Sequence, residues 1–470
     1  MMRANQGLSS EEQNRFCKPF SFRKVEVMLL RKKASIAAVI LLGSALAITG
    51  CSSGGSGSDS GAKASGTVTI SGAFTGAQGT AFQDDLNVWA KGKGITVKYN
   101  GSNNFQTSII TQVKGGQAPD IAIFPQPGIL KSLISQGLVP LDDLVNVKKI
   151  TSDEPQGIPD IAKVNGKTYG LPYNINVKSL VWYNPKAFAA AGYTVPTTDA
   201  ELSALQAEII ADGSGYPWCV GIASQGSNGW PMTDWLEEYV LRYGGLTQYN
   251  DWINHKVLFD SPLVKKAAAK VESMIFAPGA VNGGGKAMAS TDFGAAGNNL
   301  FISGGKAAGQ CFMMRQGTFI TSFFPQAIQD SVNSGSTADV NAFVLPTPQG
   351  ATTSGTLGGG DIAGAFKNNA AVKEVMSYLV GNFGTNGYDK KWTAALSPHN
   401  NYDTSNYSSP FQSIASKAVS SAKVFGFDAS DQMPGAVGAG TEWTNLTEWT
   451  AGSITLDQAL KAIDASWPTN

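Results

Sequence analysis

The stretch 68–134 alternates short apolar strands with helical runs, and this order constrains the fold more than any other feature of the chain. The patterns predict strands and helices in turn at 68–71, 82–90, 95–99, 105–113, 120–124 and 127–134. The third strand is apolar almost throughout, which is typical of a strand buried on both faces. Such an order predicts a doubly wound α/β layer.

Ligands of doubly wound sheets bind beyond the carboxyl ends of the strands, which here are 74–76 and 125–127. Later in the chain we expect strands at 177–183, 219–222, 308–315 and 340–345, and a glycine-rich loop at 355–360 before Asp361 and a further strand. We therefore predict a first lobe at 68–183, a second lobe at 184–342, and a return at 343–470 to the first lobe, with C-terminal helical segments. Two crossings between the lobes would form a hinge beside a ligand cleft.

The N-terminus indicates export from the cytoplasm. A basic cluster at 31–33 precedes an apolar run at 34–48, and small residues lead to Cys51. These features predict a signal peptide within 1–50, and the apolar run is short for a membrane span. Since the polar stretch before Met28 does not resemble a signal, we expect translation to start at Met28. The Ser-, Gly- and Ala-rich segment 51–67 is then a flexible tether.

Charge and cysteine content follow from this processing. The full chain has 35 basic and 35 acidic residues, and removal of 1–50 leaves 27 basic and 32 acidic residues. This balance and the lack of a basic patch argue against nucleic acid or another anionic partner. With Cys17 removed and Cys51 at the new N-terminus, Cys219 and Cys311 form the remaining pair. An oxidising compartment favours a disulfide between them, and two separate buried thiols are the alternative.

The stretch 216–245 holds the strongest single candidate for ligand contact. A polar, glycine-rich loop ends at Trp230, just before a helix that we expect to begin at Pro231. A large ring at that point can be a stacking platform for a ligand. The alternative is a loop tryptophan packed against the helix.

Several blocks of the sequence, in order along most of the mature chain, resemble the solute-binding proteins of bacterial ABC importers, and in particular their α-glucoside-type members. The blocks are GAFTGA at 72–77, PDIA at 119–122, FPQPG at 124–128, NVKSLVWY at 176–183, GWP at 229–231, TDW at 233–235, RQG at 315–317, GGGD at 358–361, MP at 433–434 and GAG at 438–440. Members often have glycine where this chain has Met232. The resemblance implies a two-lobe periplasmic-binding-protein-like α/β fold with a hinge and an interlobe cleft for a sugar or oligosaccharide.

Sugar binding requires aromatic faces for the apolar ring surfaces and planar polar groups for the hydroxyls. The residues that match these needs are Trp230, Phe74 and Tyr173 for stacking, with Thr75 beside them, and Gln126, Asn104, Asp234, Asp361 and Arg315 for hydrogen bonding. Besides Trp230, four of them have structural alternatives. Asp234 can complement a helix dipole, Asp361 can be a turn residue, Arg315 can be paired between the lobes, and Tyr173 can brace the hinge.

The sequence offers little support for catalysis or for a cofactor. The only histidines, His255 and His399, are far apart, and neither a phosphate loop nor a Gly-x-Ser-x-Gly motif is present. We therefore expect a non-enzyme without cofactor or metal. The expected partners are a sugar, the ABC permease subunits and the membrane, reached through a lipid on Cys51 at the extracytoplasmic face, and we expect a monomer. A lipid-anchored glycoside hydrolase and a ligand-sensing lipoprotein are the alternatives.

Overall fold

The computed structural model describes residues 64–155, 158–383, 391–392, 394–422 and 424–468. The expected signal peptide, the start at Met28, the lipidated Cys51 and most of the tether lie outside the described residues. The described chain falls within one compact unit, which spans 61–470. Within it, no helix is long and apolar enough to cross a membrane.

The first lobe is built on a six-stranded sheet in the described part of the chain, with the order β12-β11-β3-β1-β2 and β6 paired to β11. Its strands are β1 (Gly66–Gly72), β2 (Ile95–Gly101), β3 (Ile121–Phe124), β6 (Leu171–Val177), β11 (Thr356–Ala365) and β12 (Phe425–Phe427). Strand β1 is parallel to both β2 and β3, whereas β11 runs antiparallel to β3 and β6. The parallel start confirms the predicted strand–helix alternation.

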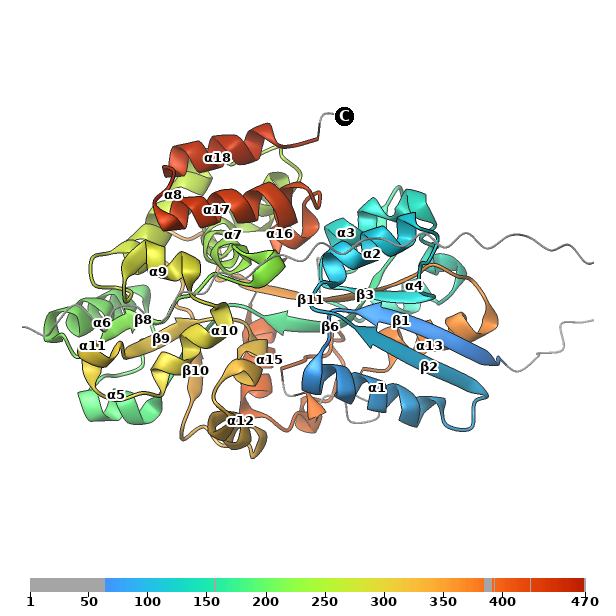
Figure 1. Ribbon diagram of the computed structural model, residues 1–470, viewed down its shortest axis with the longest axis horizontal. Coiled ribbons are helices and arrows are strands. Elements are labelled where there is room, and N and C mark those ends of the chain that lie inside the picture. The colour runs from blue at the N-terminus through green and yellow to red at the C-terminus, as the bar shows by residue number, and fades with distance from the viewer. Residues whose placement is uncertain (1–63, 156–157, 384–390, 393, 423, 469–470) are drawn as a thin grey trace, which may run out of the picture. The chain divides into compact units, whose positions relative to one another are not determined.

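Helices cover both faces of this sheet, and Figure 1 shows α1 on one side and α2 and α3 on the other. The helices that accompany the first sheet are α1 (Gly76–Ala90), α2 (Phe105–Lys114), α3 (Pro127–Ser132), α4 (Val147–Thr151) and α13 (Ala370–Gly381). A small hairpin, β4 (Lys163–Val164) with β5 (Lys167–Thr168), precedes β6. The sheet core follows the strand period, since Val68 and Ile70 of β1 are both buried.

The second lobe is built on a four-stranded sheet with the order β10-β7-β9-β8 among the described residues. Its strands are β7 (Leu180–Tyr183), β8 (Tyr216–Trp218), β9 (Cys311–Arg315) and β10 (Asn341–Val344). The helices of this half and of the C-terminal region are α5 (Pro185–Ala191), α6 (Asp199–Asp212), α7 (Trp230–Ile253), α8 (Pro262–Val271), α9 (Gly284–Ser290), α10 (Phe293–Ala296), α11 (Gly305–Ala308), α12 (Gln326–Asn333), α15 (Pro410–Ser421), α16 (Ala429–Gln432), α17 (Trp443–Ala451) and α18 (Leu456–Ala465).

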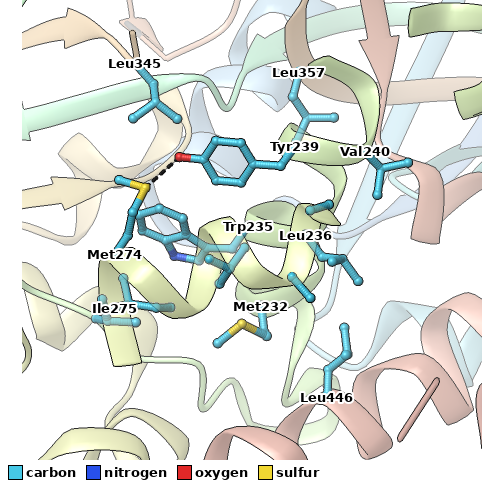
Figure 2. Packing of buried hydrophobic residues seen from close by; sticks show 14 of the residues in the cluster. Met232, Trp235, Leu236, Tyr239, Val240, Met274, Ile275, Leu345, Leu357 and Leu446 are labelled. Atoms are coloured by element: carbon cyan, nitrogen blue, oxygen red, sulfur yellow. Dashed lines mark hydrogen bonds between the residues drawn. The ribbon is translucent and has the colours of Figure 1, made fainter. Parts of the chain in front are cut away.

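Helix α7 is the centre of the second lobe. Its residues 231–242 are buried without interruption, which is typical of a helix covered on all sides. Figure 2 shows Met232, Trp235 and Tyr239 in this core, where the Tyr239 hydroxyl lies 2.7 Å from the sulfur of Met274. Helices α16 and α17 pack against α7, and the chain from 429 onward therefore joins the second lobe.

The described chain crosses between the two lobes three times, whereas the sequence predicted two crossings. The crossings are 178–179 between β6 and β7, 345–355 between β10 and β11, and residue 428 between β12 and α16. The first two lie close to the predicted boundaries at 183 and 343. However, β7 and β10 both pair within the second sheet, so the stretch 180–183 does not belong to the first. The third crossing follows the three-residue strand β12, which is too short to give a clear pattern.

Cys219 and Cys311 form a disulfide with Cα atoms 5.4 Å apart, and the predicted pairing is confirmed. The bond joins the end of β8 to the start of β9. The predicted strand at 219–222 is wrong, because β8 ends at Trp218. After Trp218 the backbone hydrogen bonds no longer follow a strand ladder; for example, the N–H of Ile222 donates to the carbonyl oxygen of Met288.

The glycines at 358–360 lie inside strand β11, so the prediction of a loop there is wrong. A Cβ atom at Gly358 would lie 2.3 Å from the carbonyl oxygen of Asn176, and one at Gly360 would lie 2.4 Å from that of Asn174. Glycine is therefore needed for the close approach of β6, not for a turn.

Candidate functional site

A cavity of about 410 Å³ lies where elements of the two lobes face each other. The first lobe contributes residues from the ends of β1 and β3 and from the paired strands β6 and β11. The second lobe contributes the start of α7 and the segments around α10 and residue 320. The lining residues are Ala73, Phe74, Gln78, Asn103, Gln106, Pro125, Gln126, Asn174, Asn176, Lys178, Ser224, Gln225, Ser227, Trp230, Asp292, Phe293, Phe319, Phe323, Gly359, Gly360, Asp361, Trp392, Ala394, Ala395, Asp428, Asp431 and Trp443.

Aromatic rings form the wall of the cavity on the second-lobe side. Trp230 is the first residue of α7 rather than the residue before it, and Gly229 precedes it with a φ of 104°. The half-buried Trp230 ring lies 4.9 Å from the ring of Phe293 and 5.7 Å from that of Phe319, both edge-on. Neither phenylalanine ring is therefore stacked flat on the indole, and parallel stacking is the mode that a flat ligand would use at this aromatic wall.

Carboxyl and amide groups line other parts of the cavity. Burial raises the pKa of Asp361 to about 7, although a hydrogen bond with Asn174 opposes the rise. Burial, followed by the nearby charge of Asp428, also raises the pKa of Asp431, which accepts a hydrogen bond from Gln126. The Oε1 atom of Gln126 is buried without a hydrogen-bond partner. Such groups are ready to bind hydroxyls, because an unpaired buried polar atom is costly.

Four of the predicted ligand residues, Trp230, Phe74, Gln126 and Asp361, line the cavity. Thr75 lies in a shallow hollow beside it, where its hydroxyl donates to Asn103 at 2.9 Å. The neighbouring Asn104 precedes α2 as its N-cap residue and is not among the lining residues.

The other three predicted ligand residues are buried away from the cavity. Tyr173 is 2% exposed and packs 5.1 Å from the ring of Phe82 in the core of the first lobe. Asp234 and Arg315 lie beneath the cavity in ion pairs, 1% and 4% exposed respectively. For Arg315, an ion pair was the structural alternative to ligand binding that the sequence suggested. Their contribution to binding would therefore be indirect.

Lys178 links the first crossing to the third. Its ammonium group forms ion pairs with Asp234 Oδ1, at 2.8 Å, and with Asp428 Oδ2. Burial lowers the pKa of Lys178, but nearby carboxylates, Asp234 and Asp428 foremost, raise it well above its usual value. The lysine therefore stays charged, and its ammonium group also lies 5.2 Å from the centre of the Trp230 ring.

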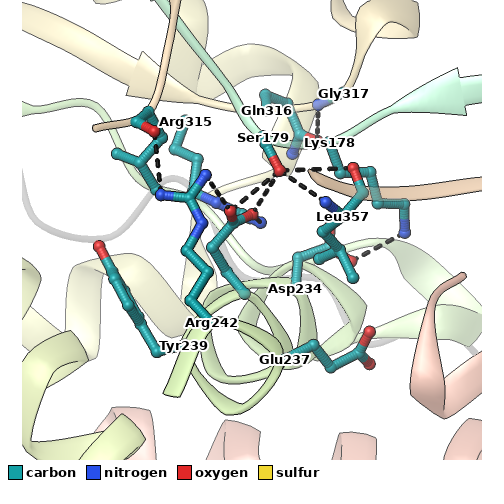
Figure 3. A network of polar contacts seen from close by, with 12 residues as sticks. Lys178, Ser179, Asp234, Glu237, Tyr239, Arg242, Arg315, Gln316, Gly317 and Leu357 are labelled. Atoms are coloured by element: carbon teal, nitrogen blue, oxygen red, sulfur yellow. Dashed lines mark hydrogen bonds and ion pairs between the residues drawn. The ribbon is translucent and has the colours of Figure 1, made fainter. Parts of the chain in front are cut away.

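Glu238 of α7 organises the second set of buried charges, and Figure 3 labels its partners Ser179, Arg242 and Arg315. Its carboxylate pairs with Arg242 and with Arg315, both at 2.7 Å, and it accepts the hydroxyl of Ser179 at 2.9 Å. Arg242 in turn donates to the carbonyl oxygen of Leu345 at 2.9 Å. Through these bonds α7 is tied to the first crossing and the second crossing.

Glu237 ties α7 to the third crossing. Its carboxylate accepts the N–H groups of Ala429 at 2.7 Å and of Ser430 at 3.0 Å. The hydroxyl of Tyr249, also from α7, lies 3.0 Å from the carbonyl oxygen of Phe427. All three crossings are thus bonded to one helix by side chains that are almost completely buried.

One carboxylate oxygen from each of Asp234, Glu237 and Asp428 lies within 4.8 Å of the other two, close enough to share a metal ion. Two of these three carboxylates already pair with Lys178. The ammonium group supplies positive charge where an ion would otherwise be needed.

Sequence patterns did not predict a role for Lys178, Glu237, Glu238 or Asp428. Lys178 had a visible signal, because it is the one charged residue in the run NVKSLVWY. The two glutamates had a weaker signal, since a pair of acids in an apolar helical run also describes a solvated helix face. Only the packing of α7 distinguishes these cases.

Comparisons with known proteins agree with this geometry. The family model for "Bacterial extracellular solute-binding protein" matches residues 73–386. The chain is 35% identical over 438 residues to the osmoprotective compounds-binding protein GgtB of Synechocystis sp., covering 91% of this chain and 98% of that protein. It is 33% identical over 415 residues to the alpha-glucosides-binding periplasmic protein AglE of Rhizobium meliloti, covering 85% and 87%.

Among solved structures, the fold is similar to that of the bacterial solute receptor AcbH, which has an exclusive substrate preference for β-D-galactopyranose. The TM-score is 0.69 at 19% identity, and the match covers 86% of this chain and 98% of that one. At this identity the similarity concerns the fold alone.

Proposed function

The chain belongs to the family of bacterial extracellular solute-binding proteins, and on that premise we propose that its cleft binds a sugar of the α-glucoside class for an ABC importer. The observation that carries this proposal is the composition of the cavity. Aromatic rings led by Trp230 form one wall, and Asp361, Asp431 and Gln126 provide hydroxyl partners on other sides. The identity to AglE, whose name specifies alpha-glucosides, supports the choice of sugar.

Membership in this family makes the chain a solute receptor rather than an enzyme. The glycoside hydrolase alternative is therefore set aside. Charge provides a further argument about the ligand, because Asp361 and Asp431 line the cavity and the lysine there is already paired twice. A neutral, hydroxyl-rich ligand suits this lining better than an anion would.

We also propose that binding closes the two lobes about the three crossings. The cavity walls belong to different lobes, so a sugar that contacts both favours the closed arrangement. The crossings are the segments that connect the lobes and must absorb the change. Because α7 holds all three from the second lobe, we expect it to move as one body with that lobe.

The anchor and the partners remain proposals from the N-terminal sequence and the family. A lipid on Cys51 would hold the protein at the outer face of the cytoplasmic membrane, with the tether to residue 67 leaving it free to reach the permease subunits. Mass spectrometry of the N-terminal peptide from exported protein tests this, since it would show a lipid-modified Cys51. An unmodified peptide that begins elsewhere would refute it.

Isothermal titration calorimetry with neutral disaccharides is the main test of the proposed ligand class. Trehalose, sucrose and maltose are α-glucosides. Trehalose and sucrose also act as osmoprotectants, so these two belong to the ligand classes named for both relatives. We expect at least one to bind without being hydrolysed, and glycine betaine not to bind. Binding of the betaine with no binding of any glucoside would overturn the proposal.

A further inference from the structure

Phe323 is an exposed aromatic residue at the cavity. It ends the short helical segment Thr318–Phe323 and contributes to the cavity lining. Its side chain is 46% exposed, and it is the sole aromatic residue among the large hydrophobic residues with high exposure in the described chain. The others of this kind, such as Leu258 and Val88, are aliphatic and do not line the cavity.

The Phe323 ring is held in place on its buried side. A Cβ atom at Gly294 would lie 2.6 Å from the ring, so the ring packs directly on the backbone of α10. The ring also lies 4.8 Å from that of Phe293, which in turn contacts Trp230. An unbroken series of rings thus runs from Trp230 through Phe293 to the exposed Phe323.

Polar groups accompany this exposed ring. Asp292 precedes Phe293, and its Oδ1 accepts the N–H groups of Gly294 and Ala295, both at 3.0 Å. Both bonds use Oδ1, and Oδ2 accepts no hydrogen bond from the described residues. The cavity-lining residues Ser224 and Gln225 supply further polar atoms on the same lobe. A fixed aromatic face beside hydroxyl partners is the arrangement that a sugar ring requires.

We propose that Phe323 forms an outer subsite that holds an additional sugar ring of a ligand whose inner ring stacks on Trp230. This rests on the proposed function and extends it, because the receptor would then bind trisaccharides more tightly than the corresponding disaccharides. A purely structural role is the competing explanation. In that case the ring serves only to cover Gly294 and Phe293, and its exposed area is incidental.

The two explanations differ in how the effect of a substitution depends on ligand length. Calorimetry should compare sucrose with raffinose and maltose with maltotriose, because each pair differs by one sugar ring. In the unaltered protein we expect at least one trisaccharide to bind about tenfold more tightly than its disaccharide. Phe323→Ala should abolish this gain and leave the disaccharide affinity within about twofold.

Two further variants complete the test. Phe323→Trp keeps an aromatic face and should retain the gain, whereas Leu258→Ala removes a similarly exposed apolar side chain outside the cavity and should change neither affinity. Equal weakening of both members of a pair by Phe323→Ala, or no preference for any trisaccharide in the unaltered protein, would overturn the subsite. If no glucoside binds at all, the proposed ligand class fails first, and that outcome is distinguishable from loss of the length preference alone.

Discussion

The wall of the cavity and the buried network beneath it use similar residue types in opposite ways. In the network, charged groups such as Glu238 and Lys178 each have at least two partners and are almost completely buried. At the wall, Trp230 is half-buried, Phe323 is exposed, and Gln126 has an unpaired oxygen. The network charges are therefore paired mainly within the protein, although Asp234 Oδ2 and Arg315 Nε have no hydrogen-bond partner among the described residues, whereas the wall keeps groups for a ligand.

This difference indicates how stability and binding are divided. Paired buried charges define the geometry of the crossings, and removing one partner leaves an uncompensated charge in a poorly solvated place. Unpaired groups at the wall contribute little to folding but gain most from a ligand. Substitutions in the network should therefore reduce stability first, and those at the wall should reduce affinity first.

The largest expected effect is that of Glu238→Gln. The change preserves volume but leaves Arg242 and Arg315 without their carboxylate, which should lower the free energy of unfolding by about 3–5 kcal/mol in urea titrations. Asp339→Asn is the control, because its ion pair with Lys186 is largely exposed and should contribute less than about 1 kcal/mol. Similar losses for the two variants would remove the distinction between network and surface.

The disulfide should come next. It closes a separation of 92 residues, and replacing Cys219 and Cys311 together by alanine should lower the free energy of unfolding by about 2–4 kcal/mol. Because β8 and β9 also pair through their backbones, the affinity for sugar should change much less than stability. Calorimetry of the folded double variant provides the second measurement, and a large loss of affinity would show that the bond shapes the cavity directly.

Trp230→Ala should show the reverse pattern. Loss of the stacking face should weaken sugar binding by about 1–3 kcal/mol, while unfolding changes less than in the Glu238 variant. The comparison needs both calorimetry and urea titration on the same protein. An unchanged affinity would eliminate Trp230 as a ligand contact and weaken the contrast between the two regions.

The smallest effect should be a pH dependence at Asp361. Its pKa is about 7 in the folded chain against an ordinary value of 3.8, so the folded state binds more protons between these values and stability falls as pH rises through this window. Asp361→Asn lacks this loss and should gain about 1 kcal/mol relative to the unaltered protein between about pH 4 and pH 8, after allowance for its partial exposure. The measurement is the melting temperature of both proteins at a series of pH values. If the two melting temperatures change with pH by the same amount, Asp361 does not have the raised pKa.

The sequence predicted the first lobe well because its information is local. Strand–helix alternation at 68–134 and the apolar strand before Phe124 both result from burial within short segments. The predicted glycine loop at 358–360 failed for a different reason. A glycine in a sequence can indicate either a turn or a strand position where another backbone approaches closely. Only the pairing of β11 with β6 decides between these two roles.

The candidate site was predictable where a residue follows a recognisable strand or loop, as with Phe74, Gln126 and Trp230. It was not predictable where function depends on which charges meet after folding. Asp234 and Arg315 have the chemistry of ligand residues, yet their partners come from positions 178 and 238. Pairing across such separations removes them from the cavity, and no pattern along the chain reveals it.

The glycines of β11 also bear on how such a receptor can change over evolutionary time. Positions 358 and 360 are closed to any side chain, because a Cβ there would collide with the backbone of β6. Position 359 is different, since its Cβ would meet only ordinary contacts, at 3.5 Å, from Asn176 and Lys178. Its residue lines the cavity. Within one strand, then, positions 358 and 360 must remain glycine for the fold to form. Position 359 between them can accept a side chain, and a larger side chain there would leave less space for a ligand.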